Sequence, residues 1–436
     1  MRETEYTEIF LDELPAEVFE FLKLLWQKNY TPIFVGGVVR DFILLDDFST
    51  DMDLEVHYAT EVSEAERLQN WKNLKTFIAG HHPIEELSYE VLRIKLPHYE
   101  LELSQPRKEI YPIKEQKSHH DFDCKLFSKL PVTESFKRRD FTFNAMGVAI
   151  YNEGSAQFID PFKGLTDLAT KKINSCSEDF VHDPVRFLRA VRFYFKLGFA
   201  FSNTLTGQLS TMNLEKVSAY YLWNEGLKSH RFFPFLKKVF ELAKHPWPLK
   251  EAFTELIKYS DELDDFHGRL QKFYKKNEKA KVPLVAIALH PKLSVAAKQI
   301  FCQTLQISFE LVKRIDTVRT LLSNWKSGTF QKFRTECQNK TFEELSQVKD
   351  WNALLVLRNE LNKLAWPLAG DLEQLEVICE LLSPSQPIDA KEFFSFAQKL
   401  RQKVSLSEDE FKRLKIPTEA RAQYLLYLAL RVSDGH

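Results

Sequence analysis

The sequence predicts an α+β fold in which residues 1–150 mix strands and helices and the rest of the chain is helical. The chain has 436 residues, which at ~100 to 200 residues per domain allows two to four domains. It contains only 13 glycines, four of them after residue 230. Because glycine is unfavourable inside helices, this scarcity favours a mostly helical second half.

Hydrophobic periodicity assigns the elements in order. Those of the first part are a helix at 15–29, a strand at 31–37 ending in two glycines, a helix at 38–45, a strand at 51–57, and an antiparallel pair at 89–96 and 99–105 around a turn at Pro97 and His98. From Asp183 onward the pattern is helical, with amphipathic stretches at 293–306, 308–324, 350–366, 388–403 and 418–431.

Charge and cysteine usage exclude several classes of protein. Lys plus Arg number 60 and Asp plus Glu 61, so any surface for nucleic acid must be local. The five cysteines are scattered and never in CxxC spacing, which argues against a disulfide framework or a zinc cluster. The N-terminus lacks an apolar core and no run of 18 apolar residues occurs, so we expect a cytoplasmic protein without membrane contact.

Carboxylates alternate along two predicted strands. Asp51 and Asp53 lie two residues apart, so their side chains project from the same face and could share a Mg²⁺ ion. Glu100 and Glu102 alternate in the same way on a later strand, and either could supply a third carboxylate. Taken alone, each pair also fits the solvated face of an ordinary strand.

Glycines and arginines around these strands suit phosphate binding. Gly36 and Gly37 lie between a strand and a helix, where bare backbone N–H groups can approach a phosphate, and Arg40 follows one turn later. Arg107 and the Arg138-Arg139-Asp140 segment are further candidates for triphosphate or ribose contacts, because guanidinium groups match phosphate oxygens. Surface ion pairing explains the arginines equally well.

The segment 182–199 begins as a well-capped helix. Asp183 suits the N-cap and Pro184 the first turn. Arg186, Arg189 and Arg192 follow at intervals of three, and this arc could form an ion-pair network or face an anionic cleft. Asp183 offers only acceptors and Arg186 only donors, so together they can pair with cytosine or adenine. Uracil and guanine would leave a buried acceptor unpaired, at a cost of ~1–3 kcal/mol.

Six blocks between about residues 30 and 230 resemble the class II tRNA nucleotidyltransferases, the CCA-adding enzymes, and the related bacterial poly(A) polymerases. The blocks are GGVVRD, DMDL, LELSQPRKE, KRRDFTFNAMG, IDPFKGLTDL and DPVRFLRAVRF. The resemblance implies a nucleotidyltransferase head with a mixed β-sheet at 1–150, a helical neck that recognises the base at 151–240, and a helical body and tail that bind tRNA at 241–436. It places a flexible loop that helps to switch specificity at about 108–135.

The resemblance also implies roles for individual residues. Asp51, Asp53 and Glu102 would be catalytic, with Mg²⁺ held by Asp51 and Asp53. The residues implied to bind the nucleotide are Gly36, Gly37, Arg40, Arg107, Arg139, Asp140, Asn144, Asp183, Arg186, Arg189 and Arg192. The partners would be the 3′ end of tRNA, CTP and ATP, and the resemblance implies no protein partner. The reaction would add CCA to tRNA without a nucleic-acid template.

Several alternatives stay open. A CC-adding or A-adding enzyme and a poly(A) polymerase would share the same head chemistry, and a non-catalytic RNA-binding protein could use the same scaffold. The sequence also departs from the family pattern. Tyr220 and Tyr221 stand where a Glu-Arg pair is usual, and His182 where Glu is usual. The histidines near 245, 267 and 290 do not form an HD pair, so we expect no accessory phosphohydrolase domain.

Overall fold

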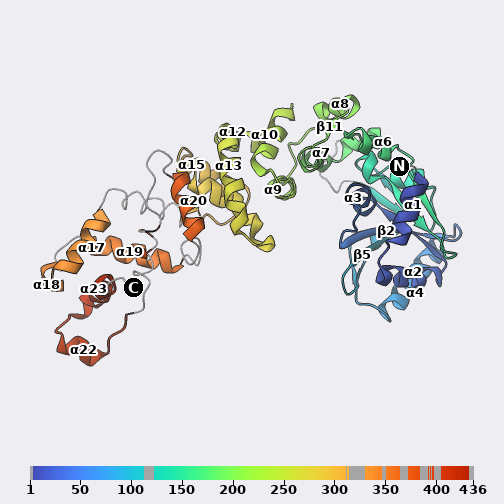
Figure 1. Cartoon of the computed structure of the whole chain (residues 1–436). Helices are drawn as coiled ribbons and strands as arrows, with labels where there is room; N and C mark the ends of the chain where they lie inside the picture. The colour runs from blue at the N-terminus through green and yellow to red at the C-terminus, as the bar shows by residue number, and fades with distance from the viewer. Residues whose placement is uncertain are drawn as a thin grey trace. The chain divides into compact units, whose positions relative to one another are not determined.

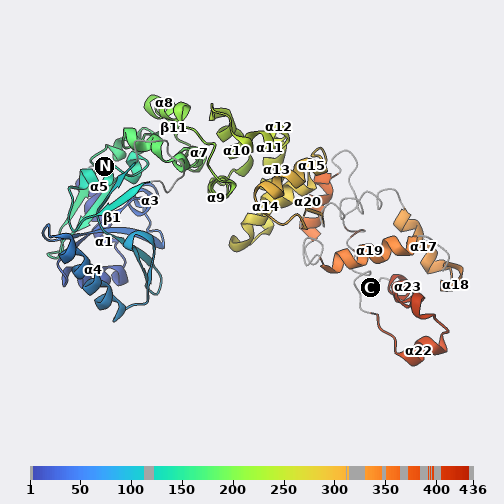
Figure 2. The ribbon, with the colours of Figure 1, turned by 180° about the vertical axis from the view of Figure 1, so that it is seen from behind.

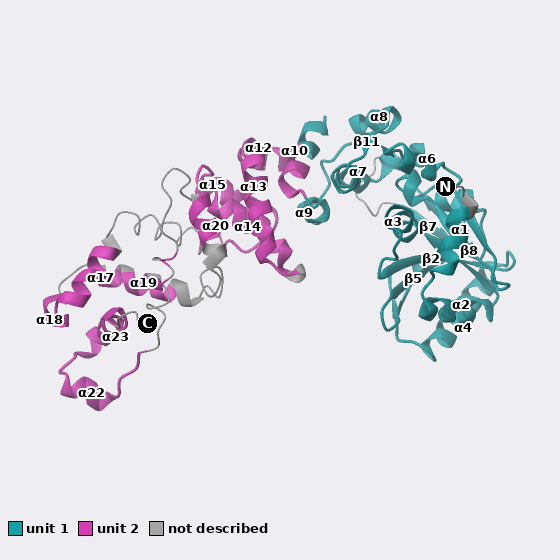
Figure 3. Ribbon diagram, in the orientation of Figure 1, with its two compact units in different colours: residues 1–230, 238–248 teal, residues 231–237, 249–436 magenta. Residues whose placement is uncertain are grey.

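The chain divides into two compact units. The computed structural model describes residues 3–111, 122–310, 312–313, 329–345, 350–363, 372–382, 404–431 and four positions between 391 and 396. Figures 1 and 2 show the ribbon from opposite sides. In Figure 3, unit 1 comprises Met1–His230 and Lys238–Pro248, and unit 2 comprises Arg231–Lys237 and Leu249–His436. The helix α10 (Phe232–Leu242) therefore contributes residues to both units.

A seven-stranded mixed sheet forms the centre of the head (Figure 1). Its strands, in spatial order, are β3 (Ile84–Glu86), β4 (Leu92–Lys95), β5 (Glu100–Ser104), β2 (Asp51–Tyr58), β1 (Tyr30–Val35), β8 (Gly147–Ile150) and β9 (Ala156–Ile159). Strands β2 and β5 are parallel, whereas every other neighbouring pair is antiparallel. The predicted antiparallel pairing of β4 with β5 is confirmed.

Helices with one apolar face pack on this sheet. They are α1 (Glu3–Asp12), α2 (Ala16–Trp26), α3 (Gly37–Leu45) and α4 (Glu64–Ala79). Helix α2 buries Val18, Phe21, Leu22 and Leu25, whose spacing of three and four places them on one face. The Phe10 ring of α1 lies edge-on to Phe34 of β1, with centroids 5.3 Å apart. These contacts give the head an aromatic and aliphatic core around β1.

A two-stranded ribbon stands apart from the sheet. It pairs β6 (Arg107–Ile110) with β7 (Asp123–Leu126) in antiparallel register. The predicted flexible loop at about 108–135 includes this ribbon, but its residues 112–121 lie outside the described part of the chain. The described part of that segment ends with the short helix α5 (Val132–Phe136).

The neck follows the sheet directly. The β8–β9 hairpin carries the sheet to Ile159, beyond the boundary expected at residue 150. After it come α6 (Gly164–Ala169), α7 (Pro184–Leu197), α8 (Asn203–Thr211), α9 (Ala219–Lys228) and a parallel strand pair of β10 (Lys172–Ile173) with β11 (Ala200–Phe201). The segment 151–240 is therefore helical apart from these three short strands. The division into head, neck, body and tail stays a prediction.

Aromatic rings join the neck to the head. Phe193 of α7 contacts Phe141 and Phe143 in edge-to-face geometry, at centroid distances of 5.4 and 5.3 Å. Phe143 belongs to the 3₁₀ turn η2 (Thr142–Asn144), which precedes β8. All three rings are buried, so α7 is fixed against the turn that leads into the sheet.

Unit 2 is helical throughout its described residues. Its helices include α12 (Thr254–Lys258), α13 (Ser260–Leu270), α14 (Val282–Leu289), α15 (Val295–Thr304), α17 (Thr329–Asn339), α18 (Phe342–Leu345), α19 (Asp350–Lys363), α20 (Leu372–Leu382), α22 (Glu408–Arg413) and α23 (Arg421–Arg431). All eight residues of α14 are buried. The predicted mixed-sheet head followed by helices is therefore confirmed.

The amphipathic stretches can be compared with these helices. Those predicted at 293–306, 350–366 and 418–431 contain α15, α19 and α23. The stretches predicted at 308–324 and 388–403 lie largely outside the described residues. Within the described part of the chain, none of the helices combines the length and apolar character needed to cross a membrane.

Gly164 provides a test of how tightly α6 packs on η2. A methyl group added there would collide with the carbonyl of Thr142 and lie 2.8 Å from the Met146 Cγ atom. We expect Gly164→Ala to lower the free energy of unfolding by about 1–3 kcal/mol, measured by urea denaturation, because a tightly packed site cannot absorb the extra carbon.

Gly207 of α8 supplies the matched control, because an added Cβ atom there meets no atom within 4 Å. Since alanine is the better helix former, Gly207→Ala should raise stability by about 0.5–1 kcal/mol. Equal stability changes in the two variants would contradict the close packing of α6 on η2.

Candidate nucleotide-binding site

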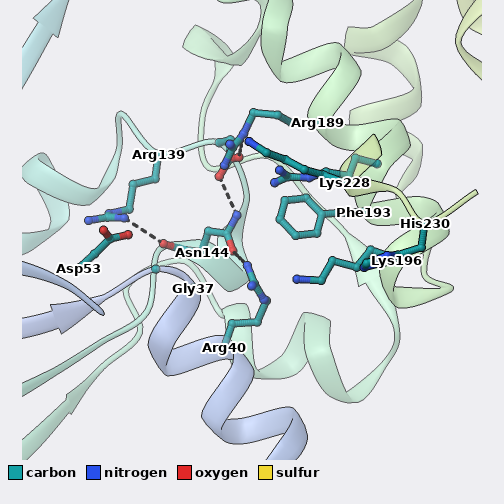
Figure 4. Close-up of a pocket in the computed structure, with 13 residues that line it drawn as sticks. Gly37, Arg40, Asp53, Arg139, Asn144, Arg189, Phe193, Lys196, Lys228 and His230 are labelled. Carbon is teal, nitrogen blue, oxygen red and sulfur yellow. Dashed lines mark hydrogen bonds and ion pairs between the residues drawn. The ribbon is translucent and has the colours of Figure 1, made fainter. Parts of the chain in front are cut away.

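The turn between β1 and α3 forms one edge of a cavity of about 420 Å³. Gly36 has φ of 78°, and a Cβ atom there would lie 3.1 Å from Arg139 Nη1 and 3.5 Å from Asp53 Oδ2. Both the backbone conformation and the close neighbours therefore require glycine. The cavity (Figure 4) is lined by Gly36, Gly37, Arg40, Asp53, Arg139, Asp140, Asn144, Arg189, Arg192, Phe193, Lys196, Lys228 and His230.

Positive charge dominates this first cavity. Six lysine and arginine side chains line it against two carboxylates. Burial and the neighbouring Arg189 lower the pKa of Arg192 to about 10. Burial also lowers the pKa of Lys196, although Asp41 partly offsets this. Bringing an anion into the cavity would relieve this crowding of cations.

Buried nitrogen atoms without hydrogen-bond partners also favour an anionic ligand. The Nε atoms of Arg107, Arg138, Arg139 and Arg192 are buried and lack a hydrogen-bond partner. Buried donors in native structures normally have partners. A polyphosphate offers many acceptor oxygens that guanidinium groups can contact, so the donor set fits such a ligand.

Asp140 connects the head to the neck from the floor of the cavity. Its Oδ1 atom accepts hydrogen bonds from Phe141 N at 2.8 Å and Asn144 Nδ2 at 2.9 Å, and Arg189 Nε donates to Oδ2 at 2.6 Å. Burial by itself would raise the pKa of Asp140, but the charge of Arg189 and these hydrogen bonds hold it at about 2. The carboxylate is therefore charged at neutral pH.

Asn144 extends this network to the glycine turn. Its Oδ1 atom accepts a hydrogen bond from Arg40 Nη1 at 2.5 Å, as Figure 4 shows. Arg40 also donates to both carboxylate oxygens of Asp41 at 2.7 Å. A continuous polar chain thus runs from α3 through Asn144 and Asp140 to Arg189 on α7.

The strand carboxylates share one sheet face. Asp51 is in register with Glu100, and Asp53 with Glu102, across the parallel β2–β5 pair. All four side chains therefore project from the same side of the sheet. This confirms the shared face of Asp51 and Asp53. Of the four, only Asp53 lines the first cavity.

Asp53 lies in an unusual electrostatic setting. Although the residue is open to solvent on one side, desolvation raises the pKa of its carboxyl group; Arg139 opposes the shift and Glu102 adds to it. A cation beside Asp53 would favour the charged carboxylate. The pair of Asp51 and Asp53 fits Mg²⁺, which takes one or two carboxylates together with substrate phosphates.

Glu102 is engaged elsewhere. Arg93 of β4 donates to its Oε1 atom from Nη2 at 2.7 Å and from Nε at 3.1 Å. Arg93 also pairs with Glu100 at 3.0 Å and Glu85 at 3.3 Å. Among the described residues, no group of three histidine, cysteine or acidic side chains is placed to hold a metal ion. A metal-binding role for Glu102 therefore stays a prediction.

A second cavity, of about 590 Å³, adjoins the first and shares Arg139, Asp140, Arg189 and Lys228 with it. Its remaining lining residues are Tyr89, Arg107, Glu109, Phe122, Arg138, Asp183, Val185, Arg186, Tyr220, Tyr221, Asn224 and Glu225. The two cavities together contain every nucleotide-binding residue predicted from the sequence. The structure thus brings together positions that lie up to 156 residues apart, from Gly36 to Arg192.

Asp183 and Arg186 both line this second cavity but differ in their hydrogen-bond partners. Asp183 caps α7, since its Oδ1 atom accepts a hydrogen bond from Val185 N at 2.9 Å. Arg186 is only 5% exposed. Its Nη2 atom donates to Arg138 O at 2.7 Å and to the Tyr111 hydroxyl at 3.0 Å, and its Nε atom lies 3.6 Å from Asp183 Oδ2. Its Nη1 atom makes one longer contact, with Asp179 O at 3.4 Å.

Some residues of the site were missed by the sequence analysis. Glu55 is fully buried on β2, and its carboxylate accepts hydrogen bonds from Ser135 Oγ at 2.6 Å and pairs with His57 at 2.8 Å and Arg138 at 3.5 Å. Glu55 and His57 continue the alternation of Asp51 and Asp53 along β2, and this pattern could have identified them.

Four other missed residues line the first cavity: Phe193, Lys196, Lys228 and His230. The neck is braced by an ion pair between Arg192 Nη1 and Glu225 Oε2 at 3.1 Å. Tyr220 and Tyr221, which replace a pair usual in the family, line the second cavity.

Comparisons with known proteins agree with this architecture. Residues 33–174 match the poly A polymerase head domain. The A-adding tRNA nucleotidyltransferase of Aquifex aeolicus is 34% identical over 39% of this chain and 19% of its own length. The multifunctional CCA protein of Haemophilus ducreyi is 29% identical over 53% of this chain and 54% of its own length. The chain thus spans about half or less of the curated relatives it matches.

Solved structures show the same fold over the whole chain. A CCA-adding enzyme in its apo form II aligns with a TM-score of 0.61 at 18% identity, covering 100% of this chain and 96% of the other. The Thermotoga maritima CCA-adding enzyme complexed with tRNA aligns with a TM-score of 0.54 at 17% identity, covering 99% and 95%. Residues 33–174 of this chain are thus similar to the poly A polymerase head domain, and the chain shares the fold of the CCA-adding enzymes.

Proposed function

We propose that this protein adds CCA to the 3′ end of tRNA from CTP and ATP without a nucleic-acid template. The two adjoining cavities support the proposal. The first cavity is strongly basic and is lined by Asp53, and the second cavity is lined by Asp183 and Arg186. The first suits a triphosphate and the second suits its base. The names of the curated relatives, which include a multifunctional CCA protein and a CCA-adding enzyme, support the same substrates.

The reaction is a nucleotidyl transfer. The 3′ hydroxyl oxygen of tRNA attacks the α-phosphorus of CTP or ATP and forms a phosphodiester bond. The bond from the α-phosphorus to the oxygen that bridges it to the β-phosphorus breaks, pyrophosphate leaves, and the hydroxyl proton passes to water. The chain must therefore hold the triphosphate, orient the hydroxyl and stabilise the charge that develops on the leaving group.

The residues of the first cavity divide these tasks. The backbone at Gly36 and Gly37 can approach the triphosphate closely at the start of α3. Arg139, Arg189 and Lys196 supply positive charge along it. Asp51 and Asp53 would hold Mg²⁺, which when bound activates the hydroxyl and neutralises charge on the phosphates. Glu102 could join them through its Oε2 atom, because Arg93 contacts only Oε1.

Base selection falls to the second cavity. The Asp183 carboxylate would accept from the exocyclic amino group of cytosine or adenine, and Arg186 would donate to the adjacent ring nitrogen. The Nη1 group of Arg186 is the available donor, because Nη2 already contacts Tyr111 and Arg138 O, whereas Nη1 makes only a long contact of 3.4 Å with Asp179 O. Tyr111 directly follows β6, one strand of the two-stranded ribbon. This ribbon belongs to the segment predicted as a flexible loop.

One alternative has specific support. An A-adding enzyme is among the curated relatives, and it would use the same cavities for ATP alone. A CC-adding enzyme or a poly(A) polymerase would likewise share the head chemistry. A non-catalytic RNA-binding protein is disfavoured, because Asp51, Asp53 and Glu102 all remain in place.

Extension of tRNA tests the proposal directly. We expect the purified chain with Mg²⁺ to complete three transcripts, ending before CCA, after the first C and after CC, when both CTP and ATP are supplied. Products would be read at single-nucleotide resolution. Addition of CC only or of A only would identify a partial enzyme, and long A tails a poly(A) polymerase. No addition would favour the RNA-binding alternative.

Substitution of the strand carboxylates tests the metal assignment. We expect Asp51→Asn and Asp53→Asn each to slow single-turnover transfer by at least about 10³-fold, because several kcal/mol of transition-state stabilisation is lost. The melting temperature should stay close to that of the wild type, since Asp51 and Asp53 are exposed. Glu61→Gln, an exposed acid just beyond β2, is the control and should react normally. Near-normal turnover in either aspartate variant would remove the metal assignment.

Asp183→Asn tests base selection. Asparagine keeps an oxygen that can cap α7, and its amide adds a donor that can meet the O4 atom of uracil. We therefore expect the ratio of kcat/KM for CTP to that for UTP to fall by about tenfold to a hundredfold. An unchanged ratio, with transfer intact, would show that Asp183 serves only as the helix cap.

A further inference from the structure

One face of α9 forms a wall of the second cavity. Tyr220, Tyr221, Asn224, Glu225 and Lys228 all line it. Spacings of three and four residues along a helix bring these side chains to neighbouring positions on one side. The wall therefore presents two aromatic rings, an amide, a carboxylate and a cation in the cavity that Asp183 and Arg186 also line.

Tyr220 is the most accessible aromatic side chain of this wall. It is 68% exposed, and its ring meets that of Tyr221 edge-to-face, with centroids 5.5 Å apart and planes at 79°. An isolated exposed tyrosine needs no explanation on an ordinary surface. Here the ring lines a cavity whose inner residue Arg186 is 5% exposed, so it lies at the mouth rather than on the floor.

Another aromatic ring that lines this cavity is less available. Tyr89 stacks on Phe122 at a centroid distance of 5.7 Å and an angle of 24°. The Arg107 guanidinium also lies 5.3 Å from the Tyr89 centroid. Because Tyr89 already has two partners for its π-system, Tyr220 is better placed to receive a planar group from outside.

We infer that Tyr220 stacks the 3′-terminal base of the acceptor RNA. The inference rests on the proposed function and names the residue that would receive the second substrate. Asp183 and Arg186 on the floor suit the incoming base, and the first cavity suits its triphosphate, which leaves the mouth for the RNA. Single-stranded bases commonly stack on tyrosine, whatever their identity. Lys228, with 62% of its side chain exposed, lies on the same wall and suits the adjoining phosphate.

Stacking at Tyr220 can be measured without turnover. The probe is a tRNA transcript that ends before CCA and carries 2-aminopurine as its last base, mixed with the full chain in the absence of nucleotides. We expect binding to quench 2-aminopurine in the wild type and in Tyr220→Phe, which keeps the ring. In Tyr220→Ala the quench should be lost, and the Kd for RNA should rise about 5- to 150-fold.

Two controls distinguish a loss of stacking from a general loss of structure or of nucleotide binding. Leu45→Ala removes a side chain of similar exposure, 71%, from unit 1 outside both cavities, and it should match the wild type. The Kd for CTP, measured by calorimetry, should be unchanged in Tyr220→Ala.

The outcomes distinguish this inference from the proposed function. If the wild type extends the transcript while Tyr220→Ala quenches and binds it normally, only the inference is overturned. A weaker affinity for CTP in Tyr220→Ala, with RNA binding unchanged, would assign the ring to the incoming nucleotide and also overturn it. If the wild type neither binds nor extends the transcript, the proposed function fails and the inference fails with it.

Discussion

The buried charge of Asp140 is the constraint on which the site depends. A carboxylate enclosed at this position must be fully hydrogen-bonded to stay ionised, and it obtains its partners from Phe141 N, Asn144 and Arg189. These partners come from the turn before β8 and from α7. Satisfying one charge therefore fixes the angle at which the neck helix meets the sheet, and the Phe193 contacts support the same arrangement.

The same constraint explains why cations crowd the first cavity. Arg189 must face Asp140, Arg40 must face Asn144 and Asp41, and Arg192 must face Glu225. Each of these arginines balances an internal acid, yet Arg139, Lys196 and Lys228 add further positive charge around the same space. Burial is the main cause of the lowered pKa of Lys196 and Arg192, and neighbouring arginines add to it, so a negative charge in this space would favour their charged forms. A triphosphate would supply that charge without disturbing the network that shapes the cavity.

Local patterns predicted a large part of this arrangement from the sequence. Alternation placed Asp51 and Asp53 on one face, the glycine pair marked the strand-to-helix turn, and the cap at Asp183 is as expected. The pairing of Arg93 with Glu102 lies across the predicted antiparallel strand pair and could have been found from it. The contacts of Arg186 with Arg138 and Tyr111 could not be predicted, because those residues lie 48 and 75 positions away. Glu55 could have been found by following the alternation of β2 further, but its buried partners Ser135 and Arg138 come from a distant segment.

Arg93 neutralises only part of the carboxylate face of the sheet. Asp51, Asp53, Glu100 and Glu102 project from two adjacent strands, and such a concentration of negative charge destabilises the sheet unless cations offset it. Arg93 pairs with both glutamates and with Glu85, so it neutralises the half of the face that is remote from the first cavity. In the part of the chain that the structure describes, Arg139 only partly offsets the desolvation of Asp53. In the proposed reaction, the Mg²⁺ ion would complete this face beside Asp53, the one of these four acids that lines the first cavity.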